Sequence, residues 1–215
     1  MKKLKYIFLL AGALSLASCE SWLDEDPQYT INTKTQFSTV ENARQALMGC
    51  YGYMSADNAY GQAWQEVTFG YCGFGWSQTN GSSTDLLVSM DGGIDETINT
   101  MAWRGMYKVI GETNAFIANI ADSPLESADK LPMEAAARFL RALAYYHAID
   151  MFGNVPFADE TSSVSSVAPQ RITRSELFTW LETELKDLIG ANSALAEARQ
   201  NEYGRIDKGG ASMIL

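Results

Sequence analysis

Four stretches of the chain repeat apolar residues at the spacing of one helix face, and this pattern limits the fold more than any other feature. We expect helices at about 38–55, 98–120, 132–152 and 175–189, whereas no stretch of useful length alternates apolar with polar residues as a strand does. Amphipathic helices bury their apolar faces against one another. The sequence therefore predicts a mostly α fold of paired antiparallel helices, as in helical-repeat proteins.

Capping residues mark the expected helix ends. Ser38 with Glu41, and Thr173 with Glu176, have the spacing of a capping box at a helix start. Pro132 suits the first turn of the third helix, because the N–H group that proline lacks would have no acceptor within the helix there. The third helix is expected to bury a stripe made of Ala136, Phe139, Leu140, Leu143 and Tyr146.

The segments between the helices differ in character. Residues 61–93 are rich in Gly, Ser, Asn and aromatic side chains, which predicts a long ordered loop between the first two helices, whereas residues 158–173 indicate a plain connection. Within the helices, Asn114 is expected to bond to another helix, since Asn is unfavourable in a helix interior unless it is bonded. Glu134, four residues before Arg138, predicts an ion pair between the two.

The start of the chain is typical of an export signal. Lysines precede an apolar run at 7–16, which is too short for a bilayer that needs ~20 residues. Residues 16–19, Leu-Ala-Ser-Cys, resemble the bacterial lipobox, in which the cysteine is lipidated and becomes the mature N-terminus. We therefore expect a signal peptide at 1–18 and lipid attachment at Cys19; the alternative is an ordinary secretory signal that ends in Cys.

The rest of the chain divides into two expected parts. Residues 19–36 are polar and acidic and favour an extended tether, and residues 37–215 form the helical domain. After Gly204 and Arg205 another apolar helix begins near the last residue, so the domain is expected to be truncated at its C-terminal end. The formal net charge of −10 repels phosphate backbones, so nucleic acid is not an expected partner.

The cysteines and the acidic residues give little sign of a metal or cofactor. Cys50 lies on an apolar helix face and is expected to be a buried free thiol, with a bridge to Cys72 left open. No Cys/His spacing is typical of zinc, and Asp85, Asp91 and Asp95 do not have the spacing of a calcium loop. His147, the one histidine, has no partner motif and is expected to be a packed or edge residue.

Five segments, taken in order behind the lipobox, carry a resemblance to a known family. They are 22–27 (WLDEDP), 46–51 (ALMGCY), 103–110 (WRGMYKVI) with Asn114 after it, 134–156 (from EAAARFLRALAYY to FGNVP), and 204–211 with its Gly-Arg turn. Together they resemble the SusD/RagB family of nutrient-uptake outer-membrane lipoproteins of Bacteroidetes. Members of that family are much longer, so the resemblance places this chain in the N-terminal part.

The resemblance implies a fold, a place and a function. The fold would be a tetratricopeptide-like helical scaffold with a long loop insertion, held at the cell surface by its lipid in the outer membrane. Such proteins capture glycans or other nutrients and deliver them to a SusC-like TonB-dependent transporter, and they are not enzymes. The alternatives are a cell-surface helical scaffold that binds only protein, and an inactive fragment of a longer binding protein.

If the ligand is a glycan, the aromatic residues of the long loop are its expected contacts. Sugars present apolar C–H faces that pack on aromatic rings, so Tyr71, Phe74 and Trp76 are expected to bind ligand. Asn80 is expected to add an orienting hydrogen bond, as Asn99 could. The alternative is that these rings anchor the loop on the helices. A glycosidase would need two facing carboxylates, and no pair stands out and no catalytic fingerprint is present, so we expect no catalysis.

Overall fold

The computed structural model describes residues 33–72, 97–162 and 169–215, and these residues are mostly helical. The helices are α2 (Thr33–Gln36), α3 (Val40–Met54), α4 (Ala63–Tyr71), α6 (Thr97–Ala121), α7 (Ser127–Phe152), α8 (Arg174–Ile189) and α9 (Lys208–Ser212). The β pairing recorded among these residues is an isolated antiparallel bridge between Pro156 and Arg171. The prediction of a mostly α fold is therefore confirmed. The expected signal peptide and most of the tether lie outside the described residues, and α2 occupies the last part of the tether.

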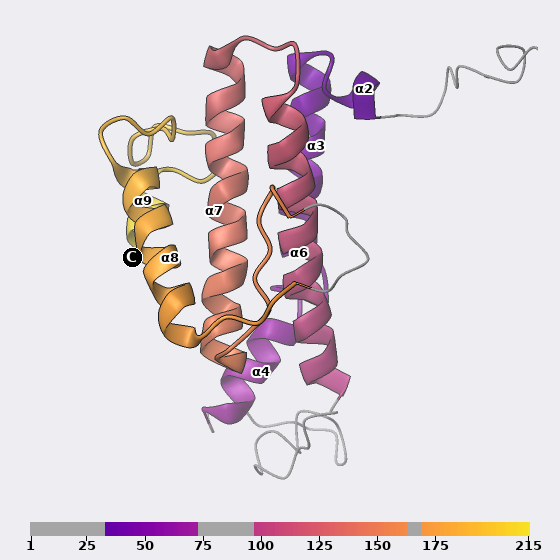
Figure 1. Cartoon of the computed structure of the whole chain (residues 1–215), viewed down its shortest axis with the longest axis vertical. Helices are drawn as coiled ribbons and strands as arrows, with labels where there is room; N and C mark the ends of the chain where they lie inside the picture. The colour runs from indigo at the N-terminus through magenta and orange to yellow at the C-terminus, as the bar shows by residue number, and fades with distance from the viewer. Residues whose placement is uncertain (1–32, 73–96, 163–168) are drawn as a thin grey trace, which may run out of the picture. The chain divides into compact units, whose positions relative to one another are not determined.

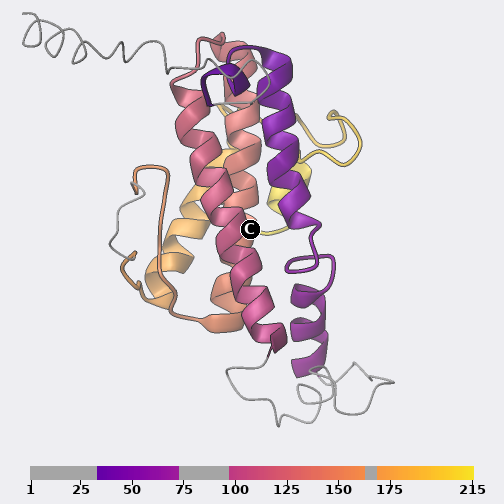
Figure 2. The ribbon, with the colours of Figure 1, turned by 90° about the vertical axis from the view of Figure 1, so that its right-hand side faces the viewer.

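Antiparallel helix pairs build the described part of the domain. α6 and α7 lie side by side, joined by a short turn, and α8 runs back along the other side of α7 (Figure 1). α3 packs against both α6 and α7, and α4 lies by the start of α6 (Figure 2). This is the paired arrangement that the sequence predicts. Within the described ranges, no helix is both long enough and apolar enough to cross a membrane.

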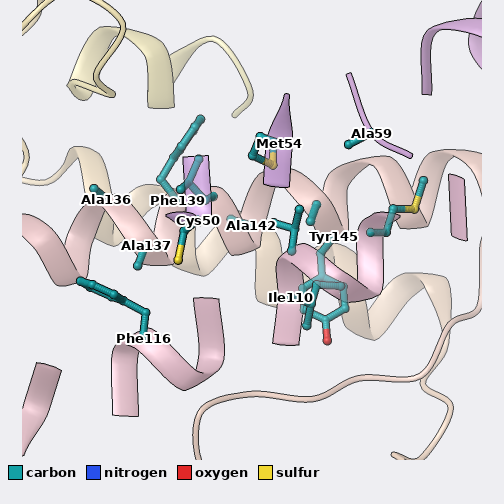
Figure 3. Packing of buried hydrophobic residues seen from close by; sticks show 14 of the residues in the cluster. Cys50, Met54, Ala59, Ile110, Phe116, Ala136, Ala137, Phe139, Ala142 and Tyr145 are labelled. Carbon is teal, nitrogen blue, oxygen red and sulfur yellow. The ribbon is translucent and has the colours of Figure 1, made fainter. Parts of the chain in front are cut away.

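The core lies where α3, α6 and α7 meet. Figure 3 labels side chains from all three helices, among them Cys50, Phe116 and Tyr145. α7 contributes several buried alanines, which let its neighbours approach closely: Ala135, Ala136, Ala137, Ala142, Ala144 and Ala148. Of the stripe predicted to be buried in this helix, Leu143 is only partly buried. The prediction is wrong for Tyr146, which is 41% exposed.

Two of the predicted helix starts need correction. The capping box at Thr173 and Glu176 is confirmed, with both reciprocal hydrogen bonds present. In α3, however, the capping residue is Thr39, whose hydroxyl accepts a bond from the Asn42 amide, rather than Ser38. α7 begins at Ser127, so Pro132 lies inside the helix rather than in its first turn. The helix continues through Pro132 because buried residues on its next turns hold it against α6.

The prediction of a long loop from residue 61 is wrong for the first part of that segment, because α4 occupies Ala63–Tyr71. The helix is anchored by Trp64, which is 1% exposed and donates its indole N–H to the carbonyl of Ala102 on α6 at 3.2 Å. Just before α4, the backbone of Asn58 lies against Gly105 so closely that a Cβ atom there would overlap the Asn58 carbonyl. Tertiary contacts, rather than the helix propensity of this short segment, therefore define α4.

A buried polar cluster joins α6, α7 and α8. Arg141 is 3% exposed, donates to Asn114 on α6 at 2.9 Å and lies within 3.3 Å of Glu184 on α8. It also pairs with Glu160, which lies in the segment between α7 and α8. The expected bond from Asn114 to another helix is confirmed. The segment after α7 is thus more than a plain connection, since Tyr145 adds two hydrogen bonds to the backbone of Ala158 there.

The ion pair expected between Arg138 and Glu134 is replaced by pairs with α8. Its guanidinium binds Glu184 in a bidentate pair, with distances of 2.9 and 2.7 Å, and also contacts Asp187 at 2.7 Å. Both carboxylates belong to α8, so the partner is across the helix pair and not Glu134 of the same helix. These hydrogen bonds with Glu184 raise the pKa of Arg138, which stays charged.

Both cysteines of the helical domain are free. Cys50 is buried, as expected, and its thiol points to the carbonyl of Glu112 at 3.8 Å. Burial raises the pKa of this thiol to about 12, so it is un-ionised and unreactive at neutral pH. Cys72 is exposed at the end of α4.

Candidate functional site

A cavity of about 380 Å³ opens where α4, the start of α6 and the end of α7 meet. The described residues that line it are Val67, Asn99, Thr100, Trp103, Arg104, Met151 and Phe152. Four of them come from the first two turns of α6, at the i, i+4 spacing that places side chains on one helix face. Its volume falls in the range of small-ligand sites.

The apolar wall of this cavity is built around Trp103. The ring of Phe152 meets Trp103 edge to face, with centroids 5.0 Å apart, and the ring of Tyr107 packs against Trp103 with centroids 4.7 Å apart. Tyr107 is fixed in turn, because its hydroxyl donates to the carbonyl of Pro156 at 2.7 Å. Burial raises the pKa of Tyr107, so it remains a neutral donor. The result is a partly exposed aromatic surface that is held in place by α7 and by the segment after it.

Three polar groups border this aromatic surface. Asn99 is 7% exposed, Thr100 is partly buried, and Arg104 is exposed. None of the described lining residues carries a carboxylate. The arrangement of an aromatic wall beside amide, hydroxyl and guanidinium donors suits a ligand with an apolar face and several oxygen acceptors.

The residues predicted to bind ligand fall at or beyond the edge of the described structure. Tyr71 is the last residue of α4, while Phe74, Trp76 and Asn80 lie outside the described residues, as do the loop aspartates. The segment that carries them connects α4 to α6, and both of these helices contribute to the cavity. Asn99, the other hydrogen-bonding candidate, lines the cavity directly.

Sequence reasoning missed the contribution of Trp103, Arg104 and Phe152 to a cavity. The first two had been interpreted only as part of a helix motif, and Phe152 as the end of the third helix. A signal that could have found two of them is the i, i+4 spacing of Trp103 from Asn99 and of Arg104 from Thr100, which places each pair on one side of α6. Their proximity to Phe152 depends on the antiparallel pairing of α6 and α7.

A second aromatic cluster surrounds His147 where α7 meets α4 and the turn before it. Nε2 of His147 lies 2.5 Å from the Tyr60 hydroxyl, and its ring packs on Trp64 with centroids 4.7 Å apart. Burial lowers the pKa of His147 to about 4, so the ring that shares this hydrogen bond with Tyr60 is neutral at pH 7. The expectation of a packed residue is confirmed. Among the residues described, no group of three or more His, Cys, Asp or Glu side chains could hold a metal ion.

The helical scaffold agrees with that of known proteins. Residues 21–211 match the SusD-like family described as "Starch-binding associating with outer membrane", and the chain belongs to this family. The match begins just after Cys19 and covers every helix described above except the last residue of α9. The resemblance seen in the sequence is thereby confirmed.

Individual relatives give the same result. The chain is 26% identical over 97% of its length to SusD-like protein P25 of Formosa agariphila, and 34% identical over 39% of its length to starch-binding protein SusD of Bacteroides thetaiotaomicron. The fold resembles surface glycan-binding protein A of Bacteroides uniformis, with a TM-score of 0.68, 20% identity and 82% of this chain covered. The chain spans 41%, 14% and 40% of these three proteins, respectively. The tetratricopeptide-like fold prediction is confirmed.

Proposed function

We propose that this protein binds glycans at the surface of the outer membrane and delivers them to a SusC-like TonB-dependent transporter. The observation that carries the proposal is the family match over residues 21–211, whose description names both starch binding and the outer membrane. The solved structure from B. uniformis is named as a surface glycan-binding protein, which supports the same class of ligand. The cavity beside Trp103 adds a site of suitable size and chemistry.

Ligand contacts are proposed for two neighbouring groups of residues. Tyr71, Phe74 and Trp76 supply aromatic faces and Asn80 a hydrogen bond, as the sequence predicts. The cavity is lined by residues of the two helices that this segment connects, together with the end of α7. Such rings recognise the apolar faces of a sugar, whereas the polar groups around them select among hydroxyl patterns.

Attachment to the membrane is proposed to come from Cys19. Cleavage of residues 1–18 would leave this cysteine lipidated at the N-terminus, with 19–36 as the tether and 37–215 as the binding domain. More than one acyl chain holds a protein firmly on a membrane, whereas a single chain gives marginal binding. The acidic composition of the chain would not attract it to anionic lipid, so the acyl chains would supply the attachment.

A binding assay with paired variants tests the proposal. Affinity electrophoresis of the full chain through gels containing single polysaccharides, both neutral and acidic, should show retardation by at least one of them. Trp76→Ala should remove the retardation, whereas Tyr203→Ala should not, because Tyr203 is a fully exposed ring far along the chain from the proposed site. Equal melting temperatures show that both variants are folded. Retardation by none of the polysaccharides would favour the alternative of a scaffold that binds only protein.

Two further measurements address delivery and catalysis. Cross-linking in native membranes followed by purification of this protein should recover a TonB-dependent transporter, and its absence would contradict delivery. We also propose that the protein does not cleave its ligand. Release of reducing ends from a bound polysaccharide by the pure protein would overturn that part of the proposal.

A further inference from the structure

Arg104 differs in its ion pairing from Lys108 on α6 and from the two arginines of α7. Arg138 and Arg141 on α7 are paired with carboxylates, and Lys108, one turn after Arg104, pairs with Glu112 at 2.5 Å. Arg104 is exposed at the cavity, and no ion pair or hydrogen bond of its side chain is found in the part of the chain that the structure describes. Its guanidinium therefore lines the cavity with no carboxylate partner among the described residues.

The surroundings of Arg104 are suited to an anion. None of the described residues that line the cavity is acidic, although the chain as a whole carries a formal net charge of −10. Asn99 and Thr100 lie in the first turn of α6, where the helix dipole also favours negative charge. A planar guanidinium matches a carboxylate or a sulfate with two parallel hydrogen bonds.

We propose that this cavity selects anionic saccharides, with Arg104 bound to a carboxylate or sulfate group while the sugar ring lies against Trp103. The proposal rests on glycan binding as the function and names the class of glycan. Trp103 and Arg104 both line the cavity, so an acidic sugar residue can contact both at once. A neutral sugar could use the aromatic wall but would leave the charge of Arg104 without a counterion.

Titration calorimetry with matched oligosaccharides tests this selectivity. The pairs are hexagalacturonate with its methyl ester, hexamannuronate with its carboxyl-reduced form, and sulfated neocarrahexaose with its desulfated form. The charged member of at least one pair should bind about tenfold more tightly than its neutral partner, the effect of one charge-assisted hydrogen-bonded contact. Preference within the first two pairs assigns a carboxylate, and preference within the third assigns a sulfate. The preference should shrink as salt rises, since an exposed ion pair is screened.

Two variants separate the role of Arg104 from that of charge in general. Arg104→Gln should remove the preference for the charged member and keep the binding of the neutral one, with no change in melting temperature because the side chain is exposed. Arg174→Gln, on α8 and outside this cavity, should keep the preference. Equal affinity for charged and neutral members, or a preference that survives Arg104→Gln, overturns the proposal and leaves glycan binding standing. Binding of none of the oligosaccharides also overturns it, and retardation of the chain by another polysaccharide in the affinity gels then shows that glycan binding itself still stands.

Discussion

At the scale of single residues, Gly105 decides how closely α6 approaches the turn before α4. A Cβ atom at this position would overlap the carbonyl of Asn58, and a backbone atom cannot swing away as a flexible side chain can. Gly111, on the same helix, has nothing within 4 Å of the place where a Cβ would be. The two glycines therefore have opposite requirements although both are helical.

Alanine substitution at the two glycines should have opposite effects on stability. Gly105→Ala should lower the free energy of unfolding by about 1–3 kcal/mol, the usual range for overpacking. Gly111→Ala should raise it by about 0.5–1 kcal/mol, because alanine is the better helix former. Urea unfolding of the full chain measures both. Similar changes for the two variants would contradict the close contact at Asn58.

His147 gives the molecule a defined response to acid. Burial lowers the pKa of its imidazole from 6.5 to about 4, so the unfolded chain takes up a proton that the folded one does not. The free energy of unfolding should therefore fall as pH decreases from about 6.5 to about 4, by up to about 1.4 kcal/mol per pH unit from this group. His147→Gln should lack this contribution. Parallel pH profiles of the two proteins, measured by urea unfolding, would show that the imidazole is not buried as described.

At the scale of elements, the pairing of α7 with α8 depends on a buried charge cluster. Arg141 connects α7 to Glu184 on α8 and to Glu160 in the connecting segment, and both pairs are less exposed than a surface ion pair such as Arg44 with Glu202. Removal of one partner from a buried pair leaves the other charge without compensation. The cluster thus holds the segment after α7 against the helices, including the Pro156 carbonyl that fixes Tyr107 beside the cavity.

Matched arginine variants test how much this cluster contributes to the stability of the fold. Arg141→Ala should lower the free energy of unfolding by about 3–5 kcal/mol, the usual cost of breaking a buried pair. Arg44→Ala removes an exposed pair and should cost at most about 1 kcal/mol. Thermal or urea unfolding distinguishes the two. Equal small changes would show that Arg141 is not a structural centre of the fold.

Much of the helical framework could be predicted, because apolar spacing records which face of a helix is buried. The helices expected at 98–120 and 175–189 match α6 and α8 to within one residue at each end. α4 could not be predicted, since it depends on Trp64 meeting α6 rather than on its own sequence. The partner of Arg138 and the cavity beside Trp103 were missed for the same reason, because both require the pairing of helices distant in sequence. The role of Phe74, Trp76 and Asn80 in ligand binding remains a prediction.

At the scale of the whole molecule, we propose a lipid anchor, a tether and a helical domain that binds ligand. Intact mass measurement of the protein from native membranes should give a chain that begins at Cys19 and carries acyl groups, which Cys19→Ala would abolish. An unmodified chain that begins at another residue would contradict the anchor. The family match begins at residue 21, so it covers the domain that such an anchor would hold at the membrane.

The most direct test of the central claim is the binding of fluorescent glycans to intact native cells, with and without this protein. The account predicts that wild-type cells bind at least one polysaccharide that retards the pure protein in a gel, and that deletion of the protein lowers this binding. Restoring the wild-type chain should recover it, whereas Trp76→Ala should not. Undiminished binding by the deletion strain, to every polysaccharide that the pure protein binds, would contradict glycan capture at the cell surface.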